Sequence, residues 1–140
     1  MRIFFDTNVL ASALMGHGLC HDLLNRALIG HTVLLGTPVH EELHRILTSK
    51  FHVPAELWRE LDKKLREFEQ APSVTTSLDT PIPDPDDVPI LACAISTKAD
   101  VFVTGDKALL GLRKIEHMPI LSPRQLWQRL TGQVQADETK

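Results

Sequence analysis

Short, continuous apolar runs alternate with amphipathic segments along most of this chain. A run without polar residues at every second position favours a strand buried on both faces, as in a parallel sheet. The expected strands are Ile3–Phe5, Thr32–Leu35, Val101–Thr104 and, with weaker patterns, Ser73–Thr76 and Ile120–Leu121.

The segments between these runs carry apolar residues at helical spacing. Helices are expected over Val9–Leu14, Cys20–Ile29, Pro54–Gln70 and Val88–Thr97, and two more begin at Thr37-Pro38 and Ser122-Pro123. Threonine or serine before proline is typical of a helix N-cap followed by the first helical residue. Strands that alternate with helices indicate a three-layer α/β/α sandwich around a mostly parallel sheet.

The composition is that of one globular domain. The chain has 140 residues, of which 43% are hydrophobic and 24% charged, which excludes a disordered, collagen-like or coiled-coil protein. No apolar run approaches the ~20 residues of a membrane span, and the start lacks a signal-peptide pattern. Cys20 and Cys93 do not make a disulfide scaffold, so a reducing cytoplasm is expected. We expect one domain over residues 1–131 and a frayed polar tail over residues 132–140.

Two aspartates come directly after predicted strands. Asp6 ends the first apolar run, and Asp106 follows the run Val101–Thr104. Ligands of parallel α/β sheets bind beyond the carboxyl ends of the strands, where two carboxylates can share a hard cation such as Mg²⁺ or Mn²⁺. The alternative for either residue alone is a helix cap or a turn, which aspartate also favours.

A third group of acids precedes the most apolar of the expected helices. Asp84, Asp86 and Asp87 exceed what one helix cap requires, although acids gather at helix N-termini because of the helix dipole. Asp87 directly precedes the apolar run and is therefore the best placed to join the same metal site. Asp84 and Asp86 remain alternatives to it.

One expected helix carries a zinc-protease pattern. His40, Glu41 and His44 match H-E-x-x-H, in which two histidines one helical turn apart bind zinc and the glutamate is the base. A third ligand would have to come from Glu60 or Glu67 on the next helix. The short pattern also arises by chance in a chain with many histidines and glutamates, so it does not decide the function alone.

Glu41 and its neighbour Glu42 would serve different sites. At about 100° per residue, Glu41 points away from the apolar stripe of its helix, whereas Glu42 lies on the flank of that stripe. A flank position reaches over the edge of a sheet, so a carboxylate metal cluster would use Glu42 and zinc chemistry would use Glu41. For both residues, the alternative is an ordinary solvated helix face.

The remaining chemical candidates are weaker. We expect the two cysteines to be small core residues, and Trp58 and Trp127 to pack in the core or at an interface. Five basic residues are either phosphate contacts or surface charge: Arg45, Lys50, Lys107, Arg113 and Lys114.

Four short motifs follow one another along the chain. They are Asp6-Thr7-Asn8-Val9-Leu10, Glu42-Leu43, Asp87 followed by Ile90-Leu91-Ala92-Cys93-Ala94, and Val103-Thr104-Gly105-Asp106. In this order and spacing they resemble the PIN domain family of metal-dependent ribonucleases and, more narrowly, its VapC-like toxins. The resemblance extends from Arg2 to about Leu130, nearly the whole chain.

The resemblance implies a metal-dependent active site made of acids. The four acids are Asp6, Glu42, Asp87 and Asp106, with Asn8 and Thr104 as supporting polar side chains. In that family the acids bind Mg²⁺ or Mn²⁺, and the metal activates water to cut single-stranded RNA. The resemblance also implies a homodimer and a small cognate antitoxin, whose peptide would enter the acidic groove with a basic residue at the metal site.

The net charge taken alone argues mildly against a nucleic-acid substrate. The chain carries −3 with a pI near 6.1, whereas a protein that only grips phosphates is usually basic. Without the four acids the remainder carries +1. Substrate phosphates would then meet the metal and nearby lysines and arginines rather than a large basic patch.

Two alternatives to a ribonuclease stay open. A small zinc hydrolase would use His40, Glu41 and His44, and it predicts stoichiometric zinc and loss of activity on Glu41→Gln. A catalytically silent PIN-like module would only bind partners, and it predicts an intact fold without RNA cleavage at any metal concentration. The presence of all four acids counts against the silent module.

Overall fold

The computed structural model describes residues 1–75 and 77–132. Its elements are β1 (Arg2–Phe5), α1 (Thr7–Met15), α2 (Leu19–Ala27), β2 (Thr32–Gly36), α3 (Thr37–Ser49), α4 (Ala55–Leu65), β3 (Glu69–Ala71), the 3₁₀ turn η1 (Pro85–Asp87), α5 (Val88–Ser96), β4 (Val101–Val103), α6 (Lys107–Leu112), β5 (Lys114–Ile115), β6 (Met118–Leu121) and α7 (Pro123–Leu130). None of the helices in these ranges is long and apolar enough to cross a membrane. Apart from Gly132, the predicted tail lies outside the described residues.

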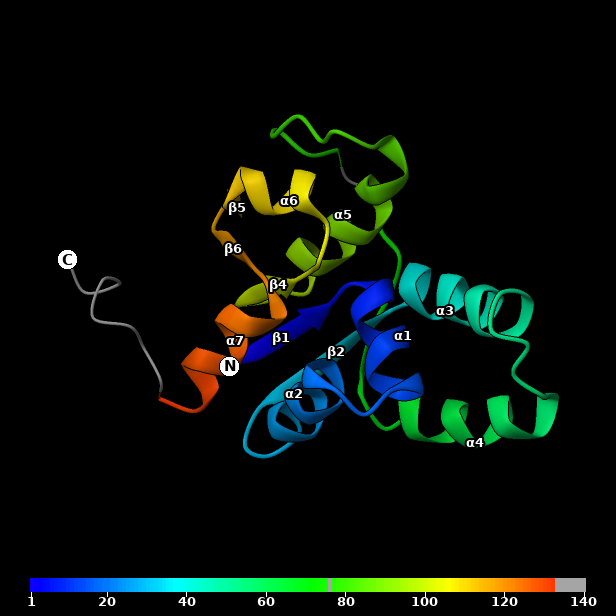
Figure 1. Cartoon of the computed structure of the whole chain (residues 1–140). Coiled ribbons are helices and arrows are strands. Elements are labelled where there is room, and N and C mark those ends of the chain that lie inside the picture. The colour runs from blue at the N-terminus through cyan, green and yellow to red at the C-terminus, as the bar shows by residue number, and fades with distance from the viewer. Residues whose placement is uncertain (76, 133–140) are drawn as a thin grey trace.

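The strands form one sheet in the order β3-β2-β1-β4-β6-β5, with helices on both sides (Figure 1). β1 lies at its centre and pairs in parallel with β2 and β4, so that Phe4 is opposite both Leu34 and Phe102. Among the described strands, only β5 runs antiparallel to its neighbour. The predicted α/β sandwich with a mostly parallel sheet is confirmed, and the carboxyl ends of β1 and β4 lie side by side at one edge.

Apart from Arg2 at the start of β1, the two central strands are apolar, because helices cover both of their faces. Every residue of Ile3–Phe5 and Val101–Val103 is at most 2% exposed. The rings of Phe4 and Phe102 stack across the strand pair with their centroids 5.6 Å apart. Burying a large side chain to this extent stabilises the folded state by about 1.5–3 kcal/mol. The packed core therefore holds the ends of β1 and β4 in fixed positions.

The strand predicted over Ser73–Thr76 is wrong. The edge strand is β3, Glu69–Ala71, and the helix that was predicted to reach Gln70 ends at Leu65. Residues 73–75 have no regular structure, and Thr76 lies outside the described residues. An edge strand of three residues with only Ala71 buried carries too little apolar pattern to be found from the sequence.

α2 and α4 begin one residue from their predicted starts, and the starts of α1 and α3 differ in a way that the local structure explains. α1 starts at Thr7 rather than Val9, because the Oδ1 of Asp6 accepts a hydrogen bond from the N–H of Thr7 at 2.8 Å. α3 starts at Thr37 itself, with Gly36 in the N-cap position that was predicted for the threonine. Both shifts place the helix start directly at the end of a strand.

The last helix begins as predicted, and three short elements were not predicted. Ser122 caps α7: its hydroxyl accepts from the N–H of Gln125 at 3.2 Å, and the Gln125 side chain accepts from the N–H of Ser122 at 2.9 Å. The turn η1, helix α6 and strand β5 have no counterpart in the prediction. They are too short to show a periodic apolar pattern.

The cysteines and tryptophans have the packing roles that were predicted. Both cysteines are free, and the buried thiol of Cys93 donates to the carbonyl of Ala71 at 3.2 Å, which joins α5 to β3. The ring of Trp58 stacks on His44 with centroids 4.5 Å apart. Trp127 is partly buried against the core.

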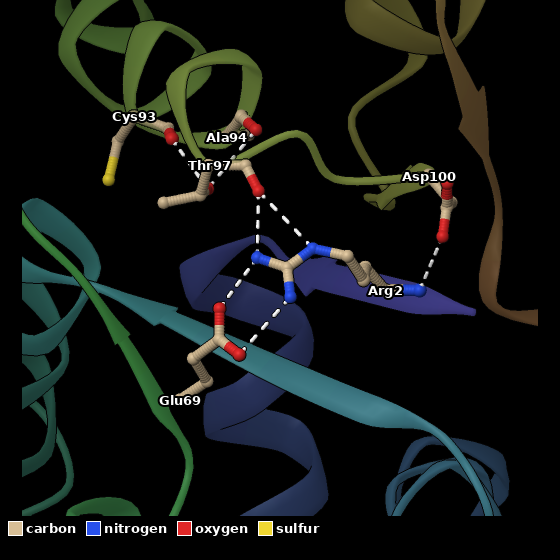
Figure 2. A network of polar contacts seen from close by, with 6 residues as sticks. All are labelled: Arg2, Glu69, Cys93, Ala94, Thr97 and Asp100. Atoms are coloured by element: carbon tan, nitrogen blue, oxygen red, sulfur yellow. Dashed lines mark hydrogen bonds and ion pairs between the residues drawn. The ribbon is translucent and has the colours of Figure 1, made fainter.

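Arg2 ties together the amino end of the sheet (Figure 2). Its guanidinium donates to both carboxylate oxygens of Glu69, at 3.1 and 2.6 Å, and to the carbonyl of Thr97 at 2.8 Å. Its backbone N–H donates to Oδ2 of Asp100 at 2.6 Å. The hydrogen bond from Arg2 holds the pKa of Glu69 below its usual value. The network joins β1 to β3 and to the end of α5, at the opposite end of β1 from Asp6.

Gly36, at the junction of β2 and α3, has no space for a side chain. A Cβ there would lie 2.8 Å from Cζ of Phe4 and 3.0 Å from Sγ of Cys93. We expect Gly36→Ala to lower the free energy of unfolding by about 1–3 kcal/mol, the cost of overpacking a filled core. Urea unfolding measures this loss. The control is Gly111→Ala on α6, where nothing lies within 4 Å. An equal loss in both variants would show that space at Gly36 is not the cause.

Candidate functional site

Asp6 is held rigidly at the carboxyl end of the central strand. Its N–H donates to the carbonyl of Val103 at 2.8 Å, which extends the pairing of β1 with β4 by one residue. Its side chain is only 9% exposed and accepts hydrogen bonds from the N–H of Thr7 and the hydroxyl of Thr104, each at 2.8 Å. Burial raises the pKa of Asp6, and these two hydrogen bonds act against the shift. Asp6 is thus both a helix cap and a carboxylate fixed at the sheet edge.

Thr104 links Asp6 to a second acid. Its fully buried hydroxyl donates to Oδ2 of Asp6 and accepts from the N–H of Asp106 at 3.1 Å. Asp106 in turn caps α6, because its Oδ1 accepts from the N–H groups of Ala108 and Leu109 at 2.8 and 3.2 Å. Within the described residues, Oδ2 of Asp106 has no hydrogen-bond partner, so it can serve a ligand.

Two further acids reach this edge from other elements. Glu42 lies in the second turn of α3, and Asp87 ends the turn η1 just before α5. Burial is the largest cause that raises the pKa of Asp87 to about 6, followed by the negative charges of Asp6, Asp84, Asp106 and Glu42. The charges of Glu42 and Asp106 also raise the pKa of Asp6. The four predicted acids therefore share one electrostatic environment.

The neighbouring acids that the sequence left as alternatives have different surroundings. Asp84 contributes to the negative charge at Asp87, but its Oδ1 caps η1 by accepting from the N–H of Asp86 at 3.0 Å. Glu42, rather than Glu41, is the glutamate whose charge reaches Asp87. The arrangement favours Glu42 and Asp87 as site residues and leaves Asp84 beside them.

This set of side chains fits a hard divalent cation. All the donors are carboxylate oxygens, which Mg²⁺ and Mn²⁺ prefer, and acids whose pKa is raised by like charges are stabilised by a nearby positive charge. No three His, Cys, Asp or Glu side chains of residues 1–75 and 77–132 are close enough to hold a metal ion as they stand. A bound divalent cation would offset the repulsion among these carboxylates.

Asn8 lies outside the hydrogen-bond network that surrounds the acids. It is exposed on the first turn of α1 and lines a cavity of about 300 Å³ between α1 and α3, together with Ile46 and Phe51. Glu42 precedes Ile46 by one helical turn, so the cavity lies along the same side of α3 as the acid. Of the two supporting residues named from the sequence, Thr104 touches an acid and Asn8 faces this cavity.

The histidines of the zinc pattern have other partners. His40 Nε2 lies 2.6 Å from Oδ1 of Asp62, and the ring of His44 stacks on Trp58. Asp62 and Trp58 belong to α4, so both histidines pack α3 against α4. No described glutamate, including the candidates on and after α4, completes a zinc site with them. The zinc-hydrolase alternative has no support in this arrangement.

One polar group at the site was missed by the sequence argument. The hydroxyl of Thr7, next to Asp6, is buried and has no hydrogen-bond partner among the described residues. Thr7 belongs to the first motif, but nothing in the sequence marks it as a site residue. Its hydroxyl is buried only because α1 begins directly at the end of β1.

Thr104→Val is expected to disturb Asp6 without changing its charge. Valine has nearly the same shape, so the carboxylate of Asp6 and the N–H of Asp106 lose their partner, and the pKa of Asp6 rises further. Loss of a residue that orients a metal ligand typically lowers metal affinity by about 10–100-fold. Calorimetric titration with Mn²⁺ measures this loss. Thr104→Ser keeps the hydroxyl and is the control; equal affinities for the two variants would contradict the role assigned to Thr104.

The chain belongs to the PIN domain family. A PIN domain profile matches residues 2–108, which include the four acids, Asn8 and Thr104. The chain is also similar to one in a crystal structure of VapBC2 from Rickettsia felis bound to a DNA fragment from their promoter, with a TM-score of 0.66 and 20% sequence identity over 87% of this chain and 98% of that chain. Among curated proteins, none matches. The PIN-like resemblance and fold predicted from the four motifs are confirmed.

Proposed function

We propose that this chain is a metal-dependent endoribonuclease that cleaves single-stranded RNA and acts as the toxin of a toxin–antitoxin pair. The observation that carries the proposal is that Asp6, Glu42, Asp87 and Asp106 influence one another at one edge of the sheet of a PIN domain. PIN domains are generally nucleases, and a group of acids at the carboxyl ends of adjacent parallel strands supports one that depends on a divalent metal.

The acids would have unequal roles in this reaction. Phosphodiester hydrolysis needs an activated water and neutralisation of charge on the phosphate, and Mg²⁺ or Mn²⁺ bound to the acids would supply both. Asp6 would be the fixed ligand, because Thr7 and Thr104 hold its two oxygens. Asp87, with a pKa of about 6, is mostly ionised at neutral pH and would be the second ligand. Glu42 and Asp106 would complete the oxygen cage.

The likeness to VapBC2 supports a protein partner. We propose that a small cognate antitoxin inactivates this chain by placing a peptide in the acidic groove, with a basic side chain opposite the acids. A homodimer and a cytoplasmic location are part of the same proposal. The PIN domain is proposed to span residues 1–131, because β6 and β5 complete the sheet beyond the matched residues 2–108 and α7 packs against β6.

The proposed function is tested with the purified protein and three labelled substrates of one sequence: single-stranded RNA, duplex RNA and single-stranded DNA. We expect cleavage inside the single-stranded RNA with Mg²⁺ or Mn²⁺ and none with EDTA. A folded protein that leaves this RNA intact at every metal concentration would overturn the proposal in favour of the silent binding module. Stoichiometric zinc and activity that depends on Glu41 would instead support the zinc hydrolase.

A further inference from the structure

Three arginines line one cavity on the flank of β6. The cavity has a volume of about 670 Å³; Arg113, just after α6, and Arg124 and Arg129 of α7 line it together with Gln125 and Gln128. Its lining contains no aspartate or glutamate. Arg113, Arg124 and Arg129 are exposed, and among the described residues none of them forms an ion pair. We call this feature the arginine cavity.

We propose that the arginine cavity binds the phosphodiester backbone of the RNA substrate, an inference that rests on the proposed function. The chain as a whole carries −3, so three unpaired positive charges around one cavity are a local exception that favours an anionic occupant. A guanidinium is planar and donates two parallel hydrogen bonds to a phosphate. The side-chain amides of Gln125 and Gln128 add neutral donors to phosphate and sugar oxygens.

The backbone at Arg113 has a positive φ, as it does at three other described residues that are not glycine: His52, Lys98 and Glu116. At Arg113 φ is 65° and ψ −40°, a conformation that glycine adopts freely and that a residue with a Cβ rarely adopts. The turn is fixed on both sides: the N–H of Arg113 donates to the carbonyl of Leu110 at 3.1 Å, and its carbonyl accepts from the N–H of Ile120 at 2.8 Å. Strained positions of this kind concentrate at functional sites.

Backbone contacts of β6 connect the lining of the arginine cavity to the residues that hold Asp6. Leu121 lines the cavity, and its carbonyl accepts from the N–H of Thr104 at 3.0 Å, while the hydroxyl of Thr104 holds Asp6. Leu110, which also lines the cavity, lies on α6, the helix that Asp106 caps. α6 and α7 both pack against β6, one on each side of it in the view of Figure 1. An RNA strand that runs from the acids past β6 would bring one of its phosphates to the arginines.

The test measures RNA binding separately from cleavage. In full-length Asp6→Asn protein with EDTA, fluorescence anisotropy follows a labelled single-stranded 20-mer of uridine as KCl is raised. The test protein also carries Arg113→Gln, Arg124→Gln and Arg129→Gln. Each phosphate contact to a single strand contributes about 0.7 to the slope of log K against log salt. We expect the slope to fall by about 2 and the affinity at low salt to fall at least tenfold.

A matched control removes three exposed charges elsewhere. Arg59→Gln, Lys63→Gln and Lys64→Gln on α4 make the same change in net charge, and these variants should keep the slope and the affinity. If the triple arginine variant does not fold, Arg113→Gly takes its place. Glycine suits the backbone there, and the loss of one contact should lower the slope by about 0.7.

The outcomes separate this inference from the proposed function. Equal slopes and affinities for the arginine and α4 variants would overturn the arginine cavity as an RNA site, even if the wild type cleaves RNA. Arginine-dependent binding in a chain whose wild type never cleaves would support the cavity and overturn the nuclease. Displacement of the RNA by a polyglutamate peptide at equal concentration would overturn the inference in favour of an acidic protein partner.

Discussion

Replacing Asp6 with asparagine is expected to lower kcat/KM for RNA cleavage by about 10³-fold or more. Metal-assisted charge stabilisation is worth several kcal/mol, and each 1.36 kcal/mol is about tenfold in rate. The fold should survive, because asparagine also caps a helix: its one carbonyl oxygen can accept from the N–H of Thr7, and its NH₂ group can donate to the hydroxyl of Thr104, which then no longer donates to residue 6. The neutral side chain is also easier to bury than the carboxylate, so the loss of activity would reflect chemistry at the site rather than unfolding.

The control for this variant is Asp22→Asn, which removes the same charge from an exposed position on α2. Initial rates with labelled single-stranded RNA in Mn²⁺ compare the two. The Asp22 variant should cleave like the wild type. An Asp6 variant that retains activity within about threefold of the Asp22 variant would remove Asp6 from the proposed metal site.

Asp87→Asn is expected to have two opposite effects: loss of RNA cleavage by about 10²-fold or more, and a gain in stability of the metal-free protein at neutral pH. The pKa of Asp87 is about 6 in the folded chain, above the ~3.9 of an unfolded aspartate. A raised pKa means that Asp87 keeps its proton to a higher pH in the folded chain than in the unfolded chain. The contribution of this group to stability is therefore fully present below about pH 4 and is lost as pH rises through about 6.

Thermal denaturation in EDTA between pH 4 and 8 checks this sign. The Tm of Asp87→Asn should be close to that of the wild type near pH 4 and should exceed it above pH 6, whereas Asp22→Asn should follow the wild type throughout. A difference between Asp87→Asn and the wild type that stays constant over this range would contradict the shifted titration. Saturating Mn²⁺ should reverse the order, because a bound metal stabilises the wild type more.

The buried part of the fold was predictable because burial leaves a strong pattern. Ile3–Phe5 of β1 and all of β4 are apolar, and the prediction of alternating strands and helices started from these runs. The edge strand β3 was placed several residues too late, and α6 was missed. Both are short elements whose structure depends on contacts with neighbours rather than on their own composition: β3 depends on its pairing with β2, and α6 depends on the cap from Asp106.

The acids of the site were predictable for a different reason. Asp6 and Asp106 follow adjacent parallel strands, so topology alone brings them to one edge of the sheet. Helix geometry distinguished the flank position of Glu42 from that of Glu41. The zinc pattern gains no support from the structure, where His40 is bound by Asp62, because a local spacing says nothing of tertiary partners. Arg113 was one of the phosphate contacts that the sequence suggested, but the arginine cavity as a whole could not be predicted. Its residues are separated along the chain and meet only after β6 brings α6 and α7 together.

The central claim is that the acid cluster is a divalent-metal site, and Mn²⁺ binding by the wild type, Asp6→Asn and Asp22→Asn tests it without any knowledge of the RNA target. Isothermal titration measures the affinities, and thermal denaturation follows the same binding, since Mn²⁺ at 100 times its Kd stabilises a folded chain by about 2.7 kcal/mol. We predict that the wild type and Asp22→Asn bind Mn²⁺ with equal affinity and gain several degrees in Tm, while Asp6→Asn loses at least tenfold in affinity. Equal Mn²⁺ binding by Asp6→Asn and the wild type would contradict the account.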